Sequence, residues 1–468
     1  MTRTPRPEDH ADLVIRGATV VSDGAYSRDI LIRDGRVSAF VEPGASGAAT
    51  EIDARGLFAL PGIVDAHVHF NDPGRSEWEG WEHGSRGAAA GGVTTVLDMP
   101  LNSLPPVLDG AAFDLKRRAA ERASIVDFGL WGGLTGQDPG PLGELYRRGA
   151  VGVKAFLCDS GVPEFPALTD DGLVPALRAA AGAGLLVGLH AEDDGVVREA
   201  TARVRSAGRR DRGAWALSRP PLAEVRAVAR ACAAAQEAGA RLHIVHLSAV
   251  EALGAIGAAR DAGVDVSSET CPHYLLFDER DVERQGPLLK CAPPIRDAAN
   301  REGLWRALSE GRIDLVASDH SPCPAADKTR GNDDMFAAWG GIAGVQTLLP
   351  ALLSESRRRG GDVLDLPRIA GFIAWRLSAA PAKRFGLWPR KGTIASGSDA
   401  DIVLLDPDRD WALAPSELQT RSGQSAYAGR AFSGRVVRTL VRGTTVFLDG
   451  HFPAAPGHGR FVAAERAA

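Results

Sequence analysis

The chain has 468 residues, of which 44% are hydrophobic and 24% are charged, as in an ordinary soluble globular protein. A net charge of -5 gives no electrostatic case for a nucleic acid or an anionic membrane as partner. The polar start "MTRTPRPEDH", the lack of a long apolar run and the five scattered cysteines without a CxxC pair predict a cytoplasmic protein with reduced thiols.

Both ends of the chain predict short β-strands. "ADLVIRGATVV" and "RDILIRDGRVSAFV" are rich in Val and Ile, and Asp34-Gly35 is a strong hairpin signal. "GSDADIVLLD" and "VVRTLVRGTTVFLDG" near the other end look alike. Because a hairpin alone is barely stable, we expect residues 1–58 and 391–468 to form one small β-sandwich domain with a shared core. Its tail, "HFPAAPGHGRFVAAERAA", is expected to be a loosely packed arm.

Between these ends, apolar runs alternate with Ala-rich helical stretches such as residues 171–184 and 223–240. The expected strands are 63–70, 93–99, 125–134, 151–157, 185–192, 242–248, 265–271 and 314–320. This alternation is typical of a parallel sheet in an α/β protein. We therefore expect residues 59–390 to form a (β/α)8 TIM-like barrel.

Polar residues recur at the ends of these strands, where the active site of such a barrel lies. His67 and His69 share one face of the first strand, because successive side chains alternate. Each residue alone has a structural explanation: a packing histidine, a snorkelling lysine or a capping aspartate. Their convergence from five strands nevertheless predicts a single site. Its members are His67, His69, Lys154, His190, His246 and Asp319.

Imidazoles and a carboxylate without a thiolate suit zinc, with cobalt, manganese or iron as alternatives. A buried lysine loses its proton readily, and its amine could then react with carbon dioxide to give a carbamate that bridges two metals. We expect two divalent ions per chain, with carboxylated Lys154 between them. The ligands would be His67, His69 and Asp319 for one ion, and His190 and His246 for the other.

Eight motifs between about residue 61 and 324 resemble, in order, the cyclic amidases of the amidohydrolase superfamily: allantoinase, dihydroorotase and hydantoinase (dihydropyrimidinase). They are "PGIVDAHVHFNDPG", "AAAGGVTTVLDMPLNS", "VGVKAFLCDSG", "GLHAED", "IVHLS", "ETCPHYL", "KCAPPIRD" and "ASDHSPC". The resemblance implies that the six residues are metal ligands, that Lys154 is N6-carboxylated and that Asp319 transfers the catalytic proton. It also implies a homotetramer.

Local residues help to choose among the substrates of this group. Dihydroorotases typically carry an arginine where this chain has Asn71, and hydantoinases a tyrosine where it has Cys158-Asp159-Ser160. "HFNDPGRSEWEG", "DMPLNSLPP" and "SRPPLAEV" are similar to allantoinases. We expect hydrolysis of (S)-allantoin to allantoate in purine catabolism, with a hydantoinase as the alternative. A dihydroorotase or a non-catalytic scaffold fits less well, since scaffolds usually lose metal ligands. Substrate contacts, if not merely loop caps, would be Asn71, Asn102 and Ser321.

Four further polar residues near these motifs have weaker signals. His243, three positions before His246, is expected to face the helices and to be structural. His320 should point away from the barrel mouth, where it could support a ligand. Asp65 could orient a ligand or make an ordinary core hydrogen bond, and His273 suggests no particular role.

Overall fold

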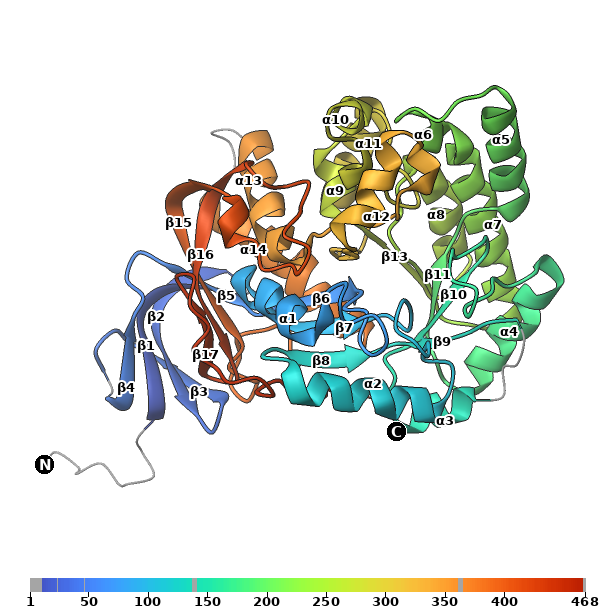
Figure 1. The fold of residues 1–468 in the computed structure, drawn as a ribbon. Coiled ribbons are helices and arrows are strands. Elements are labelled where there is room, and N and C mark those ends of the chain that lie inside the picture. The colour runs from blue at the N-terminus through green and yellow to red at the C-terminus, as the bar shows by residue number, and fades with distance from the viewer. Residues whose placement is uncertain (1–10, 23, 46, 137–140, 361–364, 466–468) are drawn as a thin grey trace, which may run out of the picture.

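The computed structural model describes residues 11–22, 24–45, 47–136, 141–360 and 365–465. Figure 1 shows a curled sheet beside a barrel of strands and helices. The sheet has eight strands in the order β17-β16-β15-β5-β1-β2-β3, with β4 paired to β1. The strands are β1 (Ala11–Val21), β2 (Ala25–Arg33), β3 (Arg36–Val41), β4 (Ala48–Asp53), β5 (Phe58–Pro61), β15 (Ile402–Ala412), β16 (Ala431–Val441) and β17 (Thr444–Leu448).

Both ends of the chain share the core of this sheet. Ile15 and Val20 from the N-terminal strands are buried in one cluster with Leu404 and Leu440 from the C-terminal strands. The hairpin turn between β2 and β3 also forms as predicted: Asp34 and Gly35 have φ angles of 51° and 73°, as a tight two-residue hairpin loop requires. The expected joining of the two ends is therefore confirmed.

The barrel contains eight strand positions, all paired in parallel where they meet. The third strand is interrupted at Trp131, which separates a three-stranded sheet from a six-stranded one. On the opposite side a parallel bridge joins Val68 to His320. The predicted (β/α)8 barrel is confirmed. Its strands are β6 (Ile63–Val68), β7 (Val93–Asp98), β8 (Asp127–Leu130), β9 (Gly132–Gly133), β10 (Val153–Phe156), β11 (Val187–His190), β12 (Leu242–Ile244), β13 (Val266–Thr270) and β14 (Leu315–Val316).

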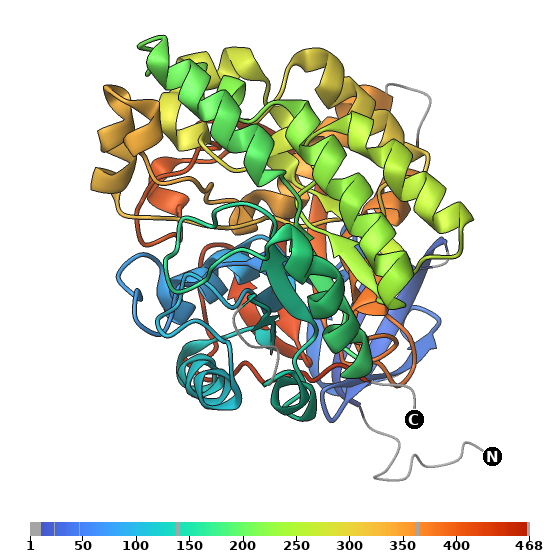
Figure 2. The same ribbon diagram turned by 90° about the vertical axis from the view of Figure 1, so that its right-hand side faces the viewer.

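Helices cover the outside of the barrel, and α4, α7 and α8 lie over the strands β10 to β13 (Figures 1 and 2). None of the helices in the described ranges is both long and apolar enough to cross a membrane. The helices are α1 (Gly80–Ala90), α2 (Gly110–Ala123), α3 (Leu142–Arg147), α4 (Asp170–Gly182), α5 (Asp194–Ser206), α6 (Ala214–Ser218), α7 (Pro221–Ala238), α8 (Leu253–Asp261), α9 (Pro272–Leu276), α10 (Glu279–Gln285), α11 (Ala298–Ser309), α12 (Ala325–Thr329), α13 (Leu348–Gly360), α14 (Leu366–Ala374) and α15 (Ala380–Arg384).

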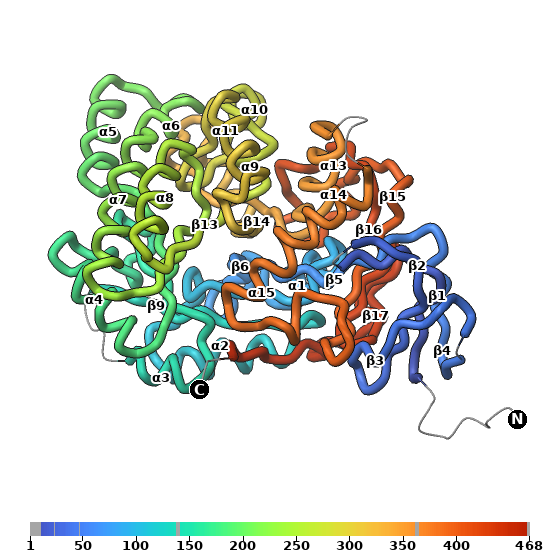
Figure 3. Tube along the Cα trace, turned by 180° about the vertical axis from the view of Figure 1, so that it is seen from behind, coloured from blue at the N-terminus to red at the C-terminus, as the bar shows by residue number. Residues whose placement is uncertain are grey.

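The C-terminal segment after β17 runs back to the barrel near α2 (Figure 3). Phe128 of β8 donates its amide to the Arg460 carbonyl at 3.0 Å and accepts from the Val462 amide at 2.8 Å. Val462 is only 1% exposed. The predicted loosely packed arm is therefore wrong for residues up to 465. The start of β8 has an open edge, because pairing with β10 begins only at Gly132, and the segment covers that edge.

A buried ion cluster joins the barrel to the sheet. The ammonium of Lys391, which is fully enclosed, lies 2.5 Å from Asp127 of β8, 3.0 Å from Asp399 and 2.7 Å from Asp401. Arg442, at the β16–β17 turn, pairs with the same Asp127. Since a buried charge is costly unless paired, this cluster fixes how the two parts meet.

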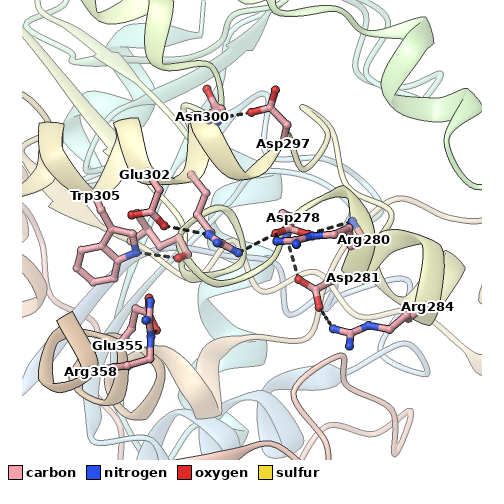
Figure 4. A network of polar contacts seen from close by, with 12 residues as sticks. Asp278, Arg280, Asp281, Arg284, Asp297, Asn300, Glu302, Trp305, Glu355 and Arg358 are labelled. Carbon is pink, nitrogen blue, oxygen red and sulfur yellow. Dashed lines mark hydrogen bonds and ion pairs between the residues drawn. The ribbon is translucent and has the colours of Figure 1, made fainter.

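A second polar network ties together the helices that follow β13 (Figure 4). Asp278 caps α10 and pairs with Arg280 at 2.6 Å and with Arg301 of α11 at 2.9 Å. Trp305 of α11 donates to the Leu275 carbonyl at 2.7 Å. These contacts hold α9, α10 and α11 together just beyond the end of β13.

Candidate metal centre

The C-terminal ends of the barrel strands open into a cavity of about 650 Å³, within the roughly 300–1,000 Å³ typical of small-molecule sites. All six residues predicted from the strand ends line it, together with Asn102 and Ser321. Asn71 is fully buried behind Asn102: its Oδ1 accepts from Asn102 Nδ2 at 3.3 Å, and its own Nδ2 donates to the Pro322 carbonyl at 3.4 Å.

Three side chains converge at one edge of the cavity. His67 Nε2 lies 3.3 Å and His69 Nε2 3.5 Å from the same carboxylate oxygen, Oδ1 of Asp319. His69 Nδ1 is 2.6 Å from the Leu101 carbonyl, which can only accept, so this nitrogen carries the hydrogen. His67 Nδ1 likewise faces the carboxylate of Glu269 at 2.6 Å.

In the neutral rings, both Nε2 atoms therefore present lone pairs to an acceptor oxygen. His67 Nε2 is buried and has no hydrogen-bond partner among the described residues. Burial also lowers the pKa of His67 from its usual value, although Asp319 and Glu269 oppose this shift. Three acceptors without a hydrogen between them repel one another, and a cation would relieve that repulsion. The donor set, two imidazoles and a carboxylate, suits a divalent metal.

A second pair of histidines lies on the neighbouring strands. His190 Nδ1 is 3.1 Å from His246 Nε2, and His190 Nε2 lies 2.8 Å from Glu192. Burial opposes ionisation of Glu192, but the Arg219 charge and the His190 bond outweigh it and lower its pKa to about 2. Glu192 therefore holds the hydrogen on His190 Nε2, and Nδ1 faces the cavity as a lone pair. Burial and the Lys154 charge keep the pKa of His246 well below normal.

Lys154 comes from β10 and is only 1% exposed. Burial lowers its pKa to about 8, against the opposing charges of Asp319 and Glu269. Its ammonium nitrogen lies 5.0 Å from the centre of the Phe156 ring, and that ring stacks on His190 with centroids 4.7 Å apart. A lysine in this setting is close to losing its proton at neutral pH, as carbamate formation requires.

The backbone is unusual at this site. Asn71, His246 and Asp319 have φ angles of 62°, 38° and 45°, in the left-handed region that non-glycine residues rarely adopt. Such residues cluster at functional sites because the surrounding structure holds them there.

At His246 the turn also breaks the alternation of the strand, so His243 faces inward. The prediction that His243 faces the helices is wrong: its Nε2 lies 3.0 Å from Glu269 and its Nδ1 2.7 Å from the Ser267 hydroxyl.

Two carboxylates that were not predicted from the sequence orient the histidines. Glu269 contacts both His67 and His243 and accepts the His246 amide at 3.3 Å. Glu192 orients His190 and pairs with Arg219. A signal was present for Glu192, which ends the mostly apolar run 185–191, where a carboxylate must be paired if it is buried. Glu269 lies among serine and threonine residues and has no such signal.

Three other predicted polar residues lie around the site. Asp65 accepts from the Ser318 amide at 3.0 Å and the His67 amide at 3.3 Å, and burial raises its pKa to about 7. His320 turns away from the cavity, with its Nε2 3.1 Å from Glu79. His273 is buried, and neither ring nitrogen has a partner within the described ranges.

The sequence profile of the amidohydrolase family matches residues 58–446. The chain therefore belongs to the amidohydrolase family, as its motifs predicted. It is 47% identical to an allantoinase of Rubrobacter xylanophilus, over 97% of this chain and 98% of that relative. It is 48% identical to an allantoinase of Solibacter usitatus, over 93% and 94% of the two chains. Among solved structures, an L-hydantoinase (dihydropyrimidinase) from Arthrobacter aurescens has a TM-score of 0.92 at 35% identity, over 97% of this chain and all of that one.

Proposed function

We propose that the chain hydrolyses the ring amide of (S)-allantoin to give allantoate, a step of purine catabolism. The convergence of His67 Nε2, His69 Nε2 and Asp319 Oδ1 at the cavity carries the proposal that this is a metal-dependent hydrolase. The choice of substrate is supported by the allantoinases to which the chain is similar over nearly its whole length.

We infer that the centre takes two divalent ions, zinc in the first place and cobalt, manganese or iron as alternatives. His67, His69 and Asp319 would hold one ion, and His190 Nδ1 and His246 Nε2 the other. Lys154, as its N6-carboxylated form, would bridge the two. When bound, such a pair of ions lowers the pKa of water and polarises a carbonyl group.

The protein's own residues then supply positioning and proton transfer. Asp319 would accept the proton of the attacking water and deliver it to the ring nitrogen as the amide C–N bond breaks. Burial raises the pKa of this carboxyl, but attraction to His67 and His69, when these rings are protonated, outweighs burial and lowers the pKa to about 2. Asp319 is therefore ionised and can accept a proton. Asn102 and Ser321 line the cavity and would hydrogen-bond the neutral substrate, with Asn71 holding the Asn102 amide in place.

A substrate panel with purified, metal-replete protein tests this function. Asn71 offers no charge at the position where dihydroorotases typically carry an arginine, so a substrate carboxylate would lack that partner. We expect the kcat/KM for allantoin to exceed that for dihydroorotate by at least about a thousandfold, or roughly 4 kcal/mol of transition-state preference. Comparable rates on dihydroorotate would refute the assignment.

Hydantoinase activity is the second candidate, favoured by the similarity to the L-hydantoinase structure. A clear preference for simple hydantoins or dihydrouracil over allantoin in the same panel would establish it. A scaffold without activity fits poorly, because all six expected ligands are present.

We further propose a homotetramer in the cytoplasm. The cysteines, all buried and unpaired, suit a reducing compartment.

A further inference from the structure

The cavity extends well beyond the candidate metal centre. Its outer part lies between α5, the short helix α6 and the segment 336–341. Allantoin differs from simple hydantoins by a ureido arm on the ring carbon next to the carbonyl under attack. If that carbonyl lies at the metal centre, the arm must lie in the adjoining part of the cavity. Three basic residues line this part: Arg198, Arg219 and Lys290.

Arg219 is held rigidly in the cavity wall. Its Nη1 donates to Glu192 and contacts Cys158 Sγ at 3.9 Å. Its guanidinium carbon lies 4.7 Å from the centre of the Trp215 ring, and the Trp215 Nε1 donates to the Cys291 carbonyl at 2.7 Å. Nε and Nη2 of Arg219 form no hydrogen bond with the described residues. Neither of these two nitrogens is fully enclosed by the surrounding protein. These two donors are free to meet a ligand.

The other two basic residues are not equivalent. Lys290 donates to the carbonyls of Phe336 at 2.9 Å and Ala338 at 2.6 Å, and its ammonium lies 4.1 Å from the Trp215 ring centre. Its donors are thus committed to holding the segment 336–341. The side chain of Arg198 is 80% exposed, so fixing it on a ligand would cost conformational entropy. Arg219 alone of the three combines a fixed position with free donors.

We propose that Arg219 determines specificity by donating a hydrogen bond from Nε or Nη2 to the carbonyl oxygen of the ureido arm. This inference rests on the proposed allantoin hydrolysis. A planar guanidinium suits a carbonyl group, since its donors point in fixed directions in one plane. The ion pair with Glu192 offsets the charge of Arg219, so this part of the wall fits a neutral carbonyl better than a free carboxylate.

The test compares two substrates in one variant. Arg219→Lys keeps a positive charge beside Glu192 but loses the planar donors. Because Glu192 also orients His190, the variant could bind metal less well, and this would slow both substrates equally. We therefore measure the ratio of kcat/KM for allantoin to that for 5-methylhydantoin, which has a methyl group in place of the arm. If 5-methylhydantoin is not turned over, its inhibition constant against allantoin hydrolysis replaces its kcat/KM.

We expect the ratio to fall by at least about 30-fold in Arg219→Lys, mainly through a higher KM for allantoin. Trp215→Leu, which removes the ring beneath Arg219 and leaves the Glu192 pair intact, should lower the ratio by about tenfold. Arg203→Lys makes the same exchange at an exposed site on α5 and should leave the ratio unchanged. A ratio within threefold of the parent in both test variants would overturn the role of Arg219. Failure of the parent itself to hydrolyse allantoin would instead refute the proposed function.

Discussion

Replacing Glu269 by glutamine keeps the shape of the side chain but removes the charge that orients His67. The carboxylate accepts from His67 Nδ1 at 2.6 Å, His243 Nε2 at 3.0 Å and the His246 amide at 3.3 Å. Glutamine has one acceptor oxygen, which can stay on His67. Its amide group then faces His243, which can adapt by carrying its hydrogen on Nδ1 toward the Ser267 hydroxyl at 2.7 Å.

The expected cost follows from this geometry. A hydrogen bond to a charged group contributes about 1.5–3 kcal/mol, and one between neutral groups about 0.5–1.5 kcal/mol. The exchange at His67 therefore weakens its orientation by about 1–1.5 kcal/mol. Loss of an outer partner of a metal-binding histidine typically costs 10–100-fold in metal affinity. For Glu269→Gln we expect the low end, a zinc affinity reduced about tenfold.

Competition between the metal-free protein and a chromophoric chelator measures this affinity. Ser267→Ala is the matched control, because it disturbs the far side of His243 without touching His67. Its zinc affinity should remain within about threefold of the parent value. If Glu269→Gln binds zinc as tightly as the parent, Glu269 does not act through His67, and the assignment of His67 Nε2 as a metal ligand loses its main support.

Three further changes test the site and the fold. Asp319→Asn should lower kcat by at least about a thousandfold while the circular dichroism spectrum is retained, because a ligand and a proton acceptor are lost together; activity within tenfold of the parent would place the proton acceptor elsewhere. Lys154→Ala, prepared with bicarbonate, should hold less than half of the parent's metal by elemental analysis, and full occupancy would exclude a bridging lysine. Lys391→Met should lower the free energy of unfolding by about 3–5 kcal/mol, because buried carboxylates lose their cation. Burial raises the pKa of Asp399, but Lys391 outweighs it and the pKa is lowered, so this contribution is present above about pH 4 and lost as the pH falls. In denaturant titrations, the difference in free energy of unfolding between the parent and Lys391→Met should become smaller below that pH. An unchanged unfolding midpoint of the variant at pH 7 would contradict the role of the cluster.

The sequence predicted the barrel and the residues at its mouth because strand ends obey simple rules. Alternation placed His67 and His69 on one face, and parallel pairing brought His190 and Asp319 to the same end of the barrel. The rules failed at His243, because the positive φ of His246 ends the alternation and depends on tertiary contacts. The partners of Glu269 were equally hidden, since His67 lies 202 positions away in the chain.

Another expectation failed because it also depended on tertiary contacts, and others remain untested. The packing of the tail on β8 could not be foreseen, because nothing in residues 451–465 indicates which strand has an open edge. The division into residues 1–58, 59–390 and 391–468, and the roles of the individual site residues, stay predictions.

The sheet shared by the two ends also sets an order of events during synthesis. Strand β5 ends at Pro61, and its partner β15 starts at Ile402. At about 5–20 residues per second, the ribosome needs roughly 20 to 70 seconds to make the chain between them. Throughout that time one edge of β5 lacks its partner, and the apolar faces of β1 and β2 lack about a third of their shared core. An unpaired edge of this kind invites pairing with other chains. The nascent protein thus keeps an aggregation-prone edge until its last strands leave the ribosome, even once the barrel is complete.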